Sequence, residues 1–298
     1  MNNILISGLI NIETTIKIKQ FPIVYAPIDY PFFGVHSTVS GVGYNIAKAI
    51  KTLGGNPALC SIIGNDIYKS MIESELESIG VNKEYVVSTA KETAQSAILY
   101  DKNKRYILLD LKDIQETRYP QEKINEILPK TDMAIVCNIN FSRDMLKTIK
   151  EAGKTIATDV HVLNNINDEY NKDFMEYSDI LFLSNENVIG KEYEFMQQLK
   201  ERYHQKILVM GMGEKGALLS VREKNTLEQY PAVKTRAVIN TIGAGDALFS
   251  SFIYFYNKTQ DPYYAIEKAT LFASYKIGER GAAQGFLTEA ELLKINQP

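Results

Sequence analysis

The sequence predicts an α/β fold in which buried strands alternate with helices around a mostly parallel sheet. Short apolar runs typical of buried strands recur along the chain, with helical patterns between them. The 298 residues, 45% of them hydrophobic, are enough to form a large core. Two stretches, residues 13–38 and 91–113, have hairpin character and could pair into a small separate sheet. We therefore expect one continuous α/β domain over residues 1–298 with a small β-sheet attached.

The first part of the chain alternates strand, helix, strand, helix. Apolar residues recur with a period near 3.6 up to Leu53, and Gly54 then ends that helical pattern. Asp66 is placed to cap the second helix, which ends before Gly80. The predicted elements are buried strands at 3–10 and 57–64, a half-exposed strand at 14–19, and helices at 42–53 and 66–79.

The middle of the chain departs from this alternation and then resumes it. Two strand-like runs flank the polar residues 101–104, which predicts a hairpin. Beyond it we expect strands at 133–139, 154–160, 179–184 and 206–210, and helices at 142–152 and 191–203. Two further helices begin near Ala244 and at Asp261, where Pro262 suits a first turn. Residues 25–37 are rich in proline and aromatic residues and do not fit a helix; they form either a mobile or partner-covered surface or an ordinary loop that caps the core.

Composition excludes several classes of protein. The net charge is −3 and both signs are interspersed, so we expect no nucleic-acid partner. No apolar run approaches the roughly 20 residues that span a bilayer, and the N-terminus does not resemble a signal peptide. Cys60 and Cys137 lie inside apolar runs, which predicts reduced core thiols in a cytoplasmic protein. Neither cysteines nor histidines have ligand spacing for zinc, so we expect no metal site built by protein side chains.

One glycine pattern, G-x-G-x-x-G at residues 211–216, resembles a dinucleotide-binding fingerprint. That fingerprint requires a helix to begin within the glycine turn, so that pyrophosphate meets free N–H groups. Here an apolar, strand-like run follows instead. We therefore interpret Gly211, Gly213 and Gly216 as part of a turn between two strands. No Walker phosphate loop is present in the sequence either.

The strongest local signal is the run of small residues from Asn240 to Asp246. It opens a helix whose continuation is almost wholly apolar and must be buried. Free N–H groups at such a helix start, together with the helix dipole, form a site for an anion such as a phosphate. Asp246 stands in the first turn, where it could either cap the helix or accept a proton from a substrate hydroxyl.

A second glycine cluster precedes the first predicted helix. Glycines before Asn45 would let a small ligand reach backbone and an amide that both donates and accepts hydrogen bonds. The alternative is a tight junction between loop and helix. Asn11 and Glu13 follow the first strand, where ligands bind in open parallel sheets, and are candidates for contacting hydroxyl groups; the alternative is a solvated loop.

Together these motifs resemble the ribokinase-like, or PfkB, carbohydrate kinase family over essentially the whole chain. The early signature corresponds to residues 40–47 and continues to 64–66, and the family's late signature, D-T-x-G-A-G-D, corresponds to residues 240–246. The resemblance implies a three-layer α/β/α sandwich whose small β-sheet, built from about 13–38 and 91–113, acts as a lid. It also implies transfer of the ATP γ-phosphoryl group to a hydroxyl of a sugar, nucleoside or related small molecule, with Mg²⁺ bridging the phosphates.

The resemblance assigns roles to individual residues. Asp246 corresponds to the general base, and the anion hole corresponds to Gly243, Ala244 and Gly245. The acceptor pocket corresponds to Asn11, Glu13, Gly43, Asn45 and Asn140. The nucleotide side corresponds to Asn185, Gly211, Gly213, Gly216 and Thr241. Tyr30 or Phe32 could cover the acceptor.

Several positions depart from the family pattern. Asn240 replaces a carboxylate that the family associates with a monovalent cation, which argues against K⁺ activation. Val188 stands where the family has a glutamate near the phosphates, and Glu186 either substitutes for it or does not. Glu13 and Asn140 replace other acidic residues, which argues against ribose itself as the acceptor.

Two functions follow from this pattern. The first is an ATP-dependent kinase of a sugar or nucleoside. The alternative is a kinase-fold protein that binds a ligand or regulates, with impaired phosphoryl transfer. The exposed edge of the lid could pair with a second subunit and form a homodimer.

Overall fold

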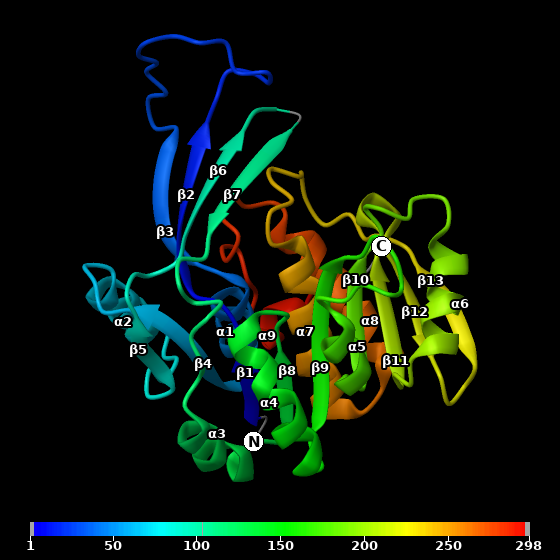
Figure 1. Cartoon of the computed structure of the whole chain (residues 1–298). Coiled ribbons are helices and arrows are strands. Elements are labelled where there is room, and N and C mark those ends of the chain that lie inside the picture. The colour runs from blue at the N-terminus through cyan, green and yellow to red at the C-terminus, as the bar shows by residue number, and fades with distance from the viewer. Residues whose placement is uncertain (1–2, 103, 296–298) are drawn as a thin grey trace.

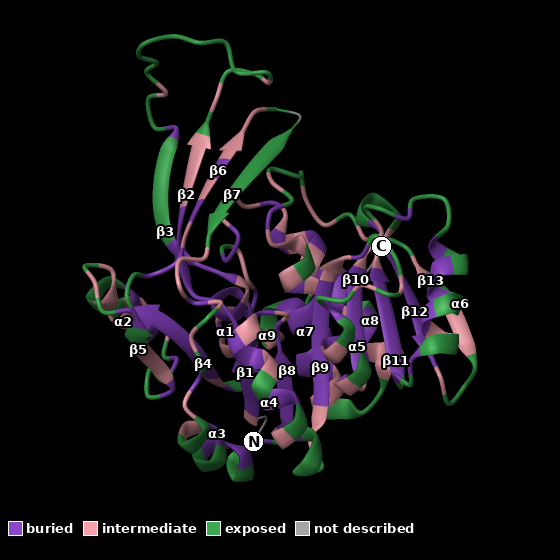
Figure 2. Cartoon of the chain, in the orientation of Figure 1, coloured by how far each residue is buried: buried purple, intermediate pink, exposed green. Residues whose placement is uncertain are grey.

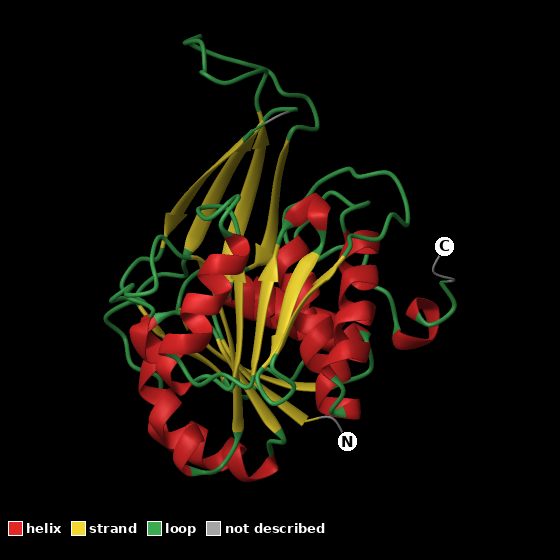
Figure 3. Cartoon of the chain, turned by 90° about the vertical axis from the view of Figure 1, so that its right-hand side faces the viewer, coloured by secondary structure: helices red, strands yellow, loops and turns green. Residues whose placement is uncertain are grey.

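The structure, a computed structural model that describes residues 3–102 and 104–295, contains a large sheet between two layers of helices and a small second sheet (Figures 1 and 3). Within the described residues, the large sheet has nine strands in the order β13-β12-β11-β10-β9-β8-β1-β4-β5. The strands from β11 to β5 pair in parallel, whereas β12 and β13 are antiparallel. The predicted α/β class with a mostly parallel sheet is therefore confirmed.

The strands of the large sheet are β1 (Asn3–Ser7), β4 (Asn56–Gly64), β5 (Val86–Ala90), β8 (Met133–Val136), β9 (Thr155–Val162), β10 (Ile180–Ser184), β11 (Ile207–Gly211), β12 (Ala217–Val221) and β13 (Thr226–Tyr230). The α-helices are α1 (Val42–Thr52), α2 (Lys69–Ser78), α3 (Gln121–Ile127), α4 (Asn140–Glu151), α5 (Lys172–Tyr177), α6 (Glu192–Arg202), α7 (Ala244–Thr259), α8 (Pro262–Lys276) and α9 (Glu289–Leu292). Two short 3₁₀ turns cover Leu128–Lys130 and Gly213–Lys215. None of the helices in the described ranges has the length and apolar character needed to cross a bilayer.

Helices cover both faces of the large sheet, which explains its near-continuous apolar strands. Ile4 and Ile6 of β1 belong to the core under α1, α7 and α8, whereas Leu5 belongs to the core under α3 to α6. Figure 2 shows the central strands buried along their length. A parallel sheet that is covered on both sides needs apolar side chains on both faces. Cys60 and Cys137 are buried and unpaired, as predicted.

The small sheet is built from two separate pairs of strands. Its order is β3 (Val35–Ser40), β2 (Asn11–Lys17), β6 (Gln95–Tyr100) and β7 (Arg105–Asp110). β2 pairs with β3 and β6 with β7 in antiparallel fashion, and β2 pairs with β6 in parallel. Figure 1 shows this sheet standing above the large one. The separate small sheet expected from the hairpin signals is thus present.

The segment that joins β2 to β3 lies at the end of the small sheet farthest from the large one (Figure 1). It contains no helix, as predicted. The Tyr30 and Phe32 rings stack on each other and are 68% and 85% exposed. Both rings lie in solvent in this structure, and the expectation that one of them covers the acceptor stays a prediction.

Two local predictions at element ends are corrected. The first strand ends at Ser7 rather than continuing to residue 10. Asp66 does not cap α2, which begins after Tyr68. Its carboxylate accepts hydrogen bonds from the Thr93 backbone N–H at 2.7 Å and the Thr93 hydroxyl at 2.9 Å, and so ties together the segments that follow β4 and β5. The cap at Asp261 is confirmed, since its side chain accepts from two backbone N–H groups of α8.

The hairpin between β6 and β7 is confirmed on both sides of its turn. The Asp101 N–H donates to the Lys104 carbonyl at 3.0 Å. Asn103, within the predicted turn, lies outside the described residues. The glycine turn at 211–216 also connects two antiparallel strands, β11 and β12, as predicted.

The carboxyl ends of the central parallel strands meet at the edge of the large sheet nearest the small sheet (Figure 1). This edge holds the starts of α1 and α7 and the segments that follow β8, β10 and β11. In open parallel sheets ligands bind outside these strand ends. The fold therefore gathers most of the candidate residues between the two sheets.

The start of α1 packs against the backbone that follows β1 without room for a side chain. A Cβ on Gly43 would lie 2.5 Å from the carbonyl carbon of Gly8. The Gly43 N–H donates to the Leu9 carbonyl at 3.0 Å. Glycine at position 43 therefore fixes how closely α1 approaches the strand edge.

We predict that Gly43→Ala lowers the free energy of unfolding by about 2 kcal/mol, because the added methyl group overpacks this junction. Urea unfolding measures the change. Gly245→Ala is the matched control, since a Cβ there meets no atom within 4 Å and should not destabilise the fold. Equal stability of Gly43→Ala and wild type would contradict the packing argument.

Candidate active site

Four polar side chains from four elements form a continuous hydrogen-bonded chain between the two sheets. Asn45 of α1 donates through Nδ2 to Asp246 Oδ2 of α7 at 2.7 Å. Ser40 of β3 donates through Oγ to Glu13 Oε2 of β2 at 3.1 Å and lies 3.5 Å from Asn45 Oδ1. We call Glu13, Ser40, Asn45 and Asp246 the polar chain. It joins the small sheet to the helix that carries the late glycine motif.

The start of α7 offers free backbone donors beside Asp246. In the described part of the chain, the N–H groups of Gly243, Gly245 and Asp246 have no hydrogen-bond acceptor. The Ala244 N–H donates to the Thr241 carbonyl at 3.1 Å, so the free N–H groups differ by one residue from the predicted anion hole. Helix N-termini with free N–H groups bind anions. The start of α7 can therefore hold a phosphate next to the Asp246 carboxylate.

Two glycines of this turn serve different purposes. Gly243 has a φ of +76°, and a Cβ there would collide with the Ala282 carbonyl oxygen. Gly245 faces open space instead. The first glycine lets the turn form, and the second leaves the space in front of the helix free for a ligand.

The two carboxyl groups of the polar chain sit in surroundings that favour their neutral forms. Burial raises the pKa of Asp246, while the hydrogen bond from Asn45 opposes this rise. Burial likewise raises the pKa of Glu13, and the Ser40 hydroxyl opposes it. A raised pKa brings a carboxylate closer to the basicity that a general base needs near neutral pH. Asp246 can therefore both orient a hydroxyl group and accept its proton.

Asn11 faces the same space with an unused acceptor. Its Nδ2 donates to Ser96 Oγ at 3.0 Å, and its Oδ1 is buried without a hydrogen-bond partner among the described residues. The residue is 3% exposed. A buried carbonyl oxygen without a donor is costly, so this atom fits a hydroxyl group supplied by a ligand.

Like Asn11, two further predicted acceptor residues, Gly43 and Asn140, are not part of the polar chain. The Gly43 N–H is used in its backbone bond to Leu9. Asn140 begins α4, where its backbone N–H and its Nδ2 both donate to Gln115, each at 3.2 Å. Gly43 acts through packing, and Asn140 contacts the segment that leaves the small sheet.

The residues predicted for the nucleotide gather farther along the same edge. The Asn185 N–H donates to the Gly211 carbonyl at 3.0 Å. A Cβ on Gly211 would lie 3.7 Å from Leu248 Cδ2, which places this turn beside the first turns of α7. Gly213 has open space around it, and Thr241 is exposed.

The carboxylate next to Asn185 is Glu192, which sequence reasoning missed. Asn185 Nδ2 donates to Glu192 Oε1 at 3.1 Å. The backbone N–H of Glu192 itself, followed by the Asn185 amide, holds the pKa of this carboxyl below its usual range. Val188 is a buried apolar residue and supplies no carboxylate, and Glu186 is exposed.

Sequence reasoning also missed Asp159 and His161 at the carboxyl end of β9. The His161 N–H donates to Asp159 Oδ1 at 2.8 Å, and His161 has a left-handed φ of 58°. Both groups act on the pKa of Asp246: His161 lowers it and Asp159 raises it. A charged residue inside an otherwise apolar strand was the available signal, since buried charges are rare without a role or a partner.

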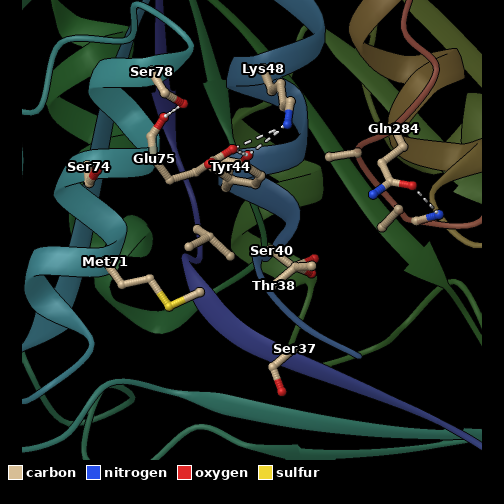
Figure 4. A pocket seen from close by; sticks show the side chains of 14 residues that line it. Ser37, Thr38, Ser40, Tyr44, Lys48, Met71, Ser74, Glu75, Ser78 and Gln284 are labelled. Atoms are coloured by element: carbon tan, nitrogen blue, oxygen red, sulfur yellow. Dashed lines mark hydrogen bonds and ion pairs between the residues drawn. The ribbon is translucent and has the colours of Figure 1, made fainter. Parts of the chain in front are cut away.

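A cavity of about 470 Å³ adjoins the polar chain at Ser40 (Figure 4). β3, α1, α2 and residues 281–284 line it. Within it the Tyr44 hydroxyl donates to Glu75, and Lys48 Nζ lies 3.3 Å from the same carboxylate. Asn11, Glu13 and Asp246 are not among its lining residues, so this cavity is a neighbour of the candidate site and not the site itself.

Comparison with known proteins gives one family. A family model described as pfkB family carbohydrate kinase matches residues 1–289. A deoxyribokinase of Salmonella typhi is 25% identical over 261 residues, which cover 83% of each protein. A nucleoside kinase of Methanocaldococcus jannaschii is 24% identical over 312 aligned positions, which cover 100% of this chain and 94% of that protein.

The fold is shared with solved structures of the same kind. The structure of Arabidopsis thaliana ribokinase complexed with ribose and ATP superimposes with a TM-score of 0.79 at 18% identity and covers 99% of both chains. This agreement confirms the three-layer sandwich with a small sheet.

We predict that Asn45→Ala raises the pKa of Asp246 above its wild-type value, because the hydrogen bond that stabilises the ionised carboxylate is lost. A ¹³C NMR titration of the aspartate carboxyl groups measures it directly. Asn187→Ala is the control, since Asn187 is exposed and donates to Asn164. An unchanged or lower pKa in Asn45→Ala would show that the amide does not stabilise the ionised carboxylate.

Proposed function

The chain belongs to the pfkB family of carbohydrate kinases, and we propose that it transfers the γ-phosphoryl group of ATP to a hydroxyl group of a sugar or nucleoside, with Asp246 as the general base. One observation carries the proposal. A carboxylate of raised pKa, held at 2.7 Å by Asn45, lies in the same helical turn as three backbone N–H groups without acceptors. Phosphoryl transfer to an alcohol needs a proton acceptor and an anion site side by side.

The reaction follows from that geometry. The acceptor oxygen attacks the γ-phosphorus, the bond from phosphorus to the bridging oxygen of ADP breaks, and the hydroxyl proton passes to Asp246. The N–H groups of Gly243, Gly245 and Asp246 stabilise the charge on the transferred group. Asn45 orients the carboxylate, so it is a positioning residue for the base.

The acceptor is recognised by groups that pair with hydroxyls. Asn11 Oδ1 is buried and lacks a donor, and Glu13 presents a carboxyl of raised pKa. A site of this kind rejects analogues that lack the matching hydroxyl, because its buried polar atoms would then stay unpaired. These groups suit a ring with several hydroxyls, which sugars and nucleosides share.

ATP would occupy the edge formed by the 211–216 turn, Asn185 and the start of α7. The open space at Gly213 and Gly245 fits a phosphate chain that approaches backbone. Glu192, kept ionised beside Asn185, fits Mg²⁺ held mainly by phosphates and water. When bound, Mg²⁺ neutralises charge on the phosphates. No cluster of three or more potential side-chain ligands for a metal ion occurs in the described ranges.

The small sheet would act as a lid and as a surface for a second copy of the chain. It carries Glu13 and Asn11 over the strand edge, so its closure would exclude water from the reacting groups. All residues of β7 are exposed, including Tyr106 and Leu108, which are 56% and 49% exposed on the same face. A second copy of the chain would cover this apolar face with its own β7, which carries the same exposed apolar side chains.

We predict that Asp246→Asn lowers kcat by about 100- to 10,000-fold, because the base is lost while the amide still accepts from Asn45. ADP release from Mg-ATP is measured across pentoses, hexoses, sugar acids and nucleosides, with and without K⁺. Asp144→Asn on α4 is the control. Undiminished turnover in Asp246→Asn would exclude it as the base. ATP binding without turnover of any acceptor would favour a ligand-binding or regulatory protein.

We predict that Leu108→Asp converts a dimer into a monomer, because a charge replaces an apolar contact across the small sheet. Light scattering coupled to gel filtration measures the mass. Ile67→Asp is the control, since Ile67 is 82% exposed on a different surface. A wild-type monomer, or a dimer that survives Leu108→Asp, would contradict this interface.

A further inference from the structure

One buried charge has no place in the reaction described so far. Lys276, the last residue of α8, is 0% exposed. Lysine is almost never fully buried unless it is paired, because the loss of hydration of an ammonium group is costly. The buried Lys276 ammonium therefore needs a polar partner that offsets its loss of hydration.

The partner is a backbone carbonyl at the anion-binding turn. Lys276 Nζ donates to the carbonyl oxygen of Ile242, the residue directly before Gly243. In a trans peptide the C=O of one residue and the N–H of the next point in opposite directions. Holding the Ile242 carbonyl on the Lys276 side therefore turns the Gly243 N–H to the other side, toward the space in front of α7.

The rest of the turn is tied to the same segment. Asn240 Nδ2 donates to the Arg280 carbonyl at 3.0 Å, and the Asn240 N–H donates to the Ile277 carbonyl at 3.1 Å. Asn240 Oδ1 accepts from the Ile242 N–H at 2.8 Å. The Lys276 ammonium and the Asn240 amide thus tie the turn before α7 to the end of α8 and the residues that follow it.

The charge of Lys276 also acts on the reacting groups. Burial lowers the pKa of Lys276 to about 8, while Asp246, Glu13 and Glu279 oppose the change and Arg105 adds to it. Near neutral pH the ammonium therefore keeps its proton. The fixed positive charge of Lys276, next to the turn before α7, stabilises negative charge that develops on a group bound at the start of α7.

We propose that Lys276 is a built-in cation of the anion-binding turn: its ammonium holds the Ile242 carbonyl and thereby fixes the Gly243 N–H for the transferred phosphoryl group. The inference rests on the proposed function and concerns a positioning residue. Because the cation belongs to the chain, the turn needs no added monovalent ion.

The first test replaces the ammonium by an apolar group of similar length. In Lys276→Met we expect kcat to fall by about 10- to 100-fold, less than the roughly 100- to 1,000-fold for outright loss of one donor to a transition-state anion, because the Gly243 N–H itself is kept. The KM of the acceptor should change by less than about twofold. Urea unfolding should show no loss of stability, since removal of a buried charge relieves its desolvation. Lys268→Met, on the same helix, is the control. Wild-type kcat in Lys276→Met would overturn the proposal.

The second test restores the charge from solution. In Lys276→Ala, ethylammonium or K⁺ chloride should raise kcat several-fold in a saturable manner, while tetramethylammonium chloride, too large for the space, should not. Wild-type enzyme should respond to none of the three salts. A wild type that needs K⁺, or a Lys276→Ala variant that no cation restores, would contradict a built-in cation.

A third readout does not depend on turnover. Calorimetry compares the Kd of ATP with that of ADP, and Lys276→Met should weaken ATP about tenfold more than ADP, because only ATP has the γ-phosphate. An unchanged ratio would overturn the inference even if the kinase is active. If wild type phosphorylates no acceptor, the proposed function fails, and the ATP to ADP ratio still decides the role of Lys276.

Discussion

The hydrogen bond between Asn45 and Asp246 is the contact on which the site depends. It joins two residues 201 positions apart, at the starts of α1 and α7. Both helices begin at the same edge of a parallel sheet, so the contact forms only if the strands between them are in order and in register. The sheet topology thus determines where the Asp246 carboxylate lies. This is why a fold with a large, rigid core supports a site made of a few polar atoms.

Burial of the polar side chains at this site costs desolvation free energy, which their hydrogen bonds to one another offset. Ser40, Asn45 and Glu13 are all nearly buried, yet each has a polar partner in the chain that leads to Asp246. In a medium of low dielectric constant such networks hold their members in one arrangement. At the candidate site, Asn11 Oδ1 and the free N–H groups of α7 are unpaired, and both are at positions where a ligand is expected. Satisfied groups set the geometry, and unsatisfied groups define what can bind.

The layered fold and the two glycine motifs could be predicted because periodicity and turn residues are local signals. The alternation of strands and helices, the helix that begins at Ala244 and the turn at 211–216 follow from short stretches of sequence. Asp66 shows the limit: an aspartate before a helix looks like a cap, and only the arrival of Thr93 from another segment gives it a different partner. Glu192 and Lys276 were missed for the same reason. Each acts on a residue brought near by tertiary packing, and an isolated glutamate or lysine in a helix is indistinguishable from a solvated one.

Ser40 lies between Glu13 and Asn45 in the polar chain and can donate its hydroxyl hydrogen to either of them. Its hydroxyl has one hydrogen and two acceptors within reach, Glu13 Oε2 at 3.1 Å and Asn45 Oδ1 at 3.5 Å, so only one of them can receive it fully. A ligand hydroxyl that donates to the same Glu13 oxygen would make that oxygen a weaker acceptor for Ser40 and so favour the Ser40 hydrogen turning toward Asn45. The amide that orients Asp246 would then gain a partner at the moment when the small sheet takes hold of its ligand. A ligand bound at the small sheet would in this way be coupled to the carboxylate on α7 through the position of the single Ser40 hydrogen.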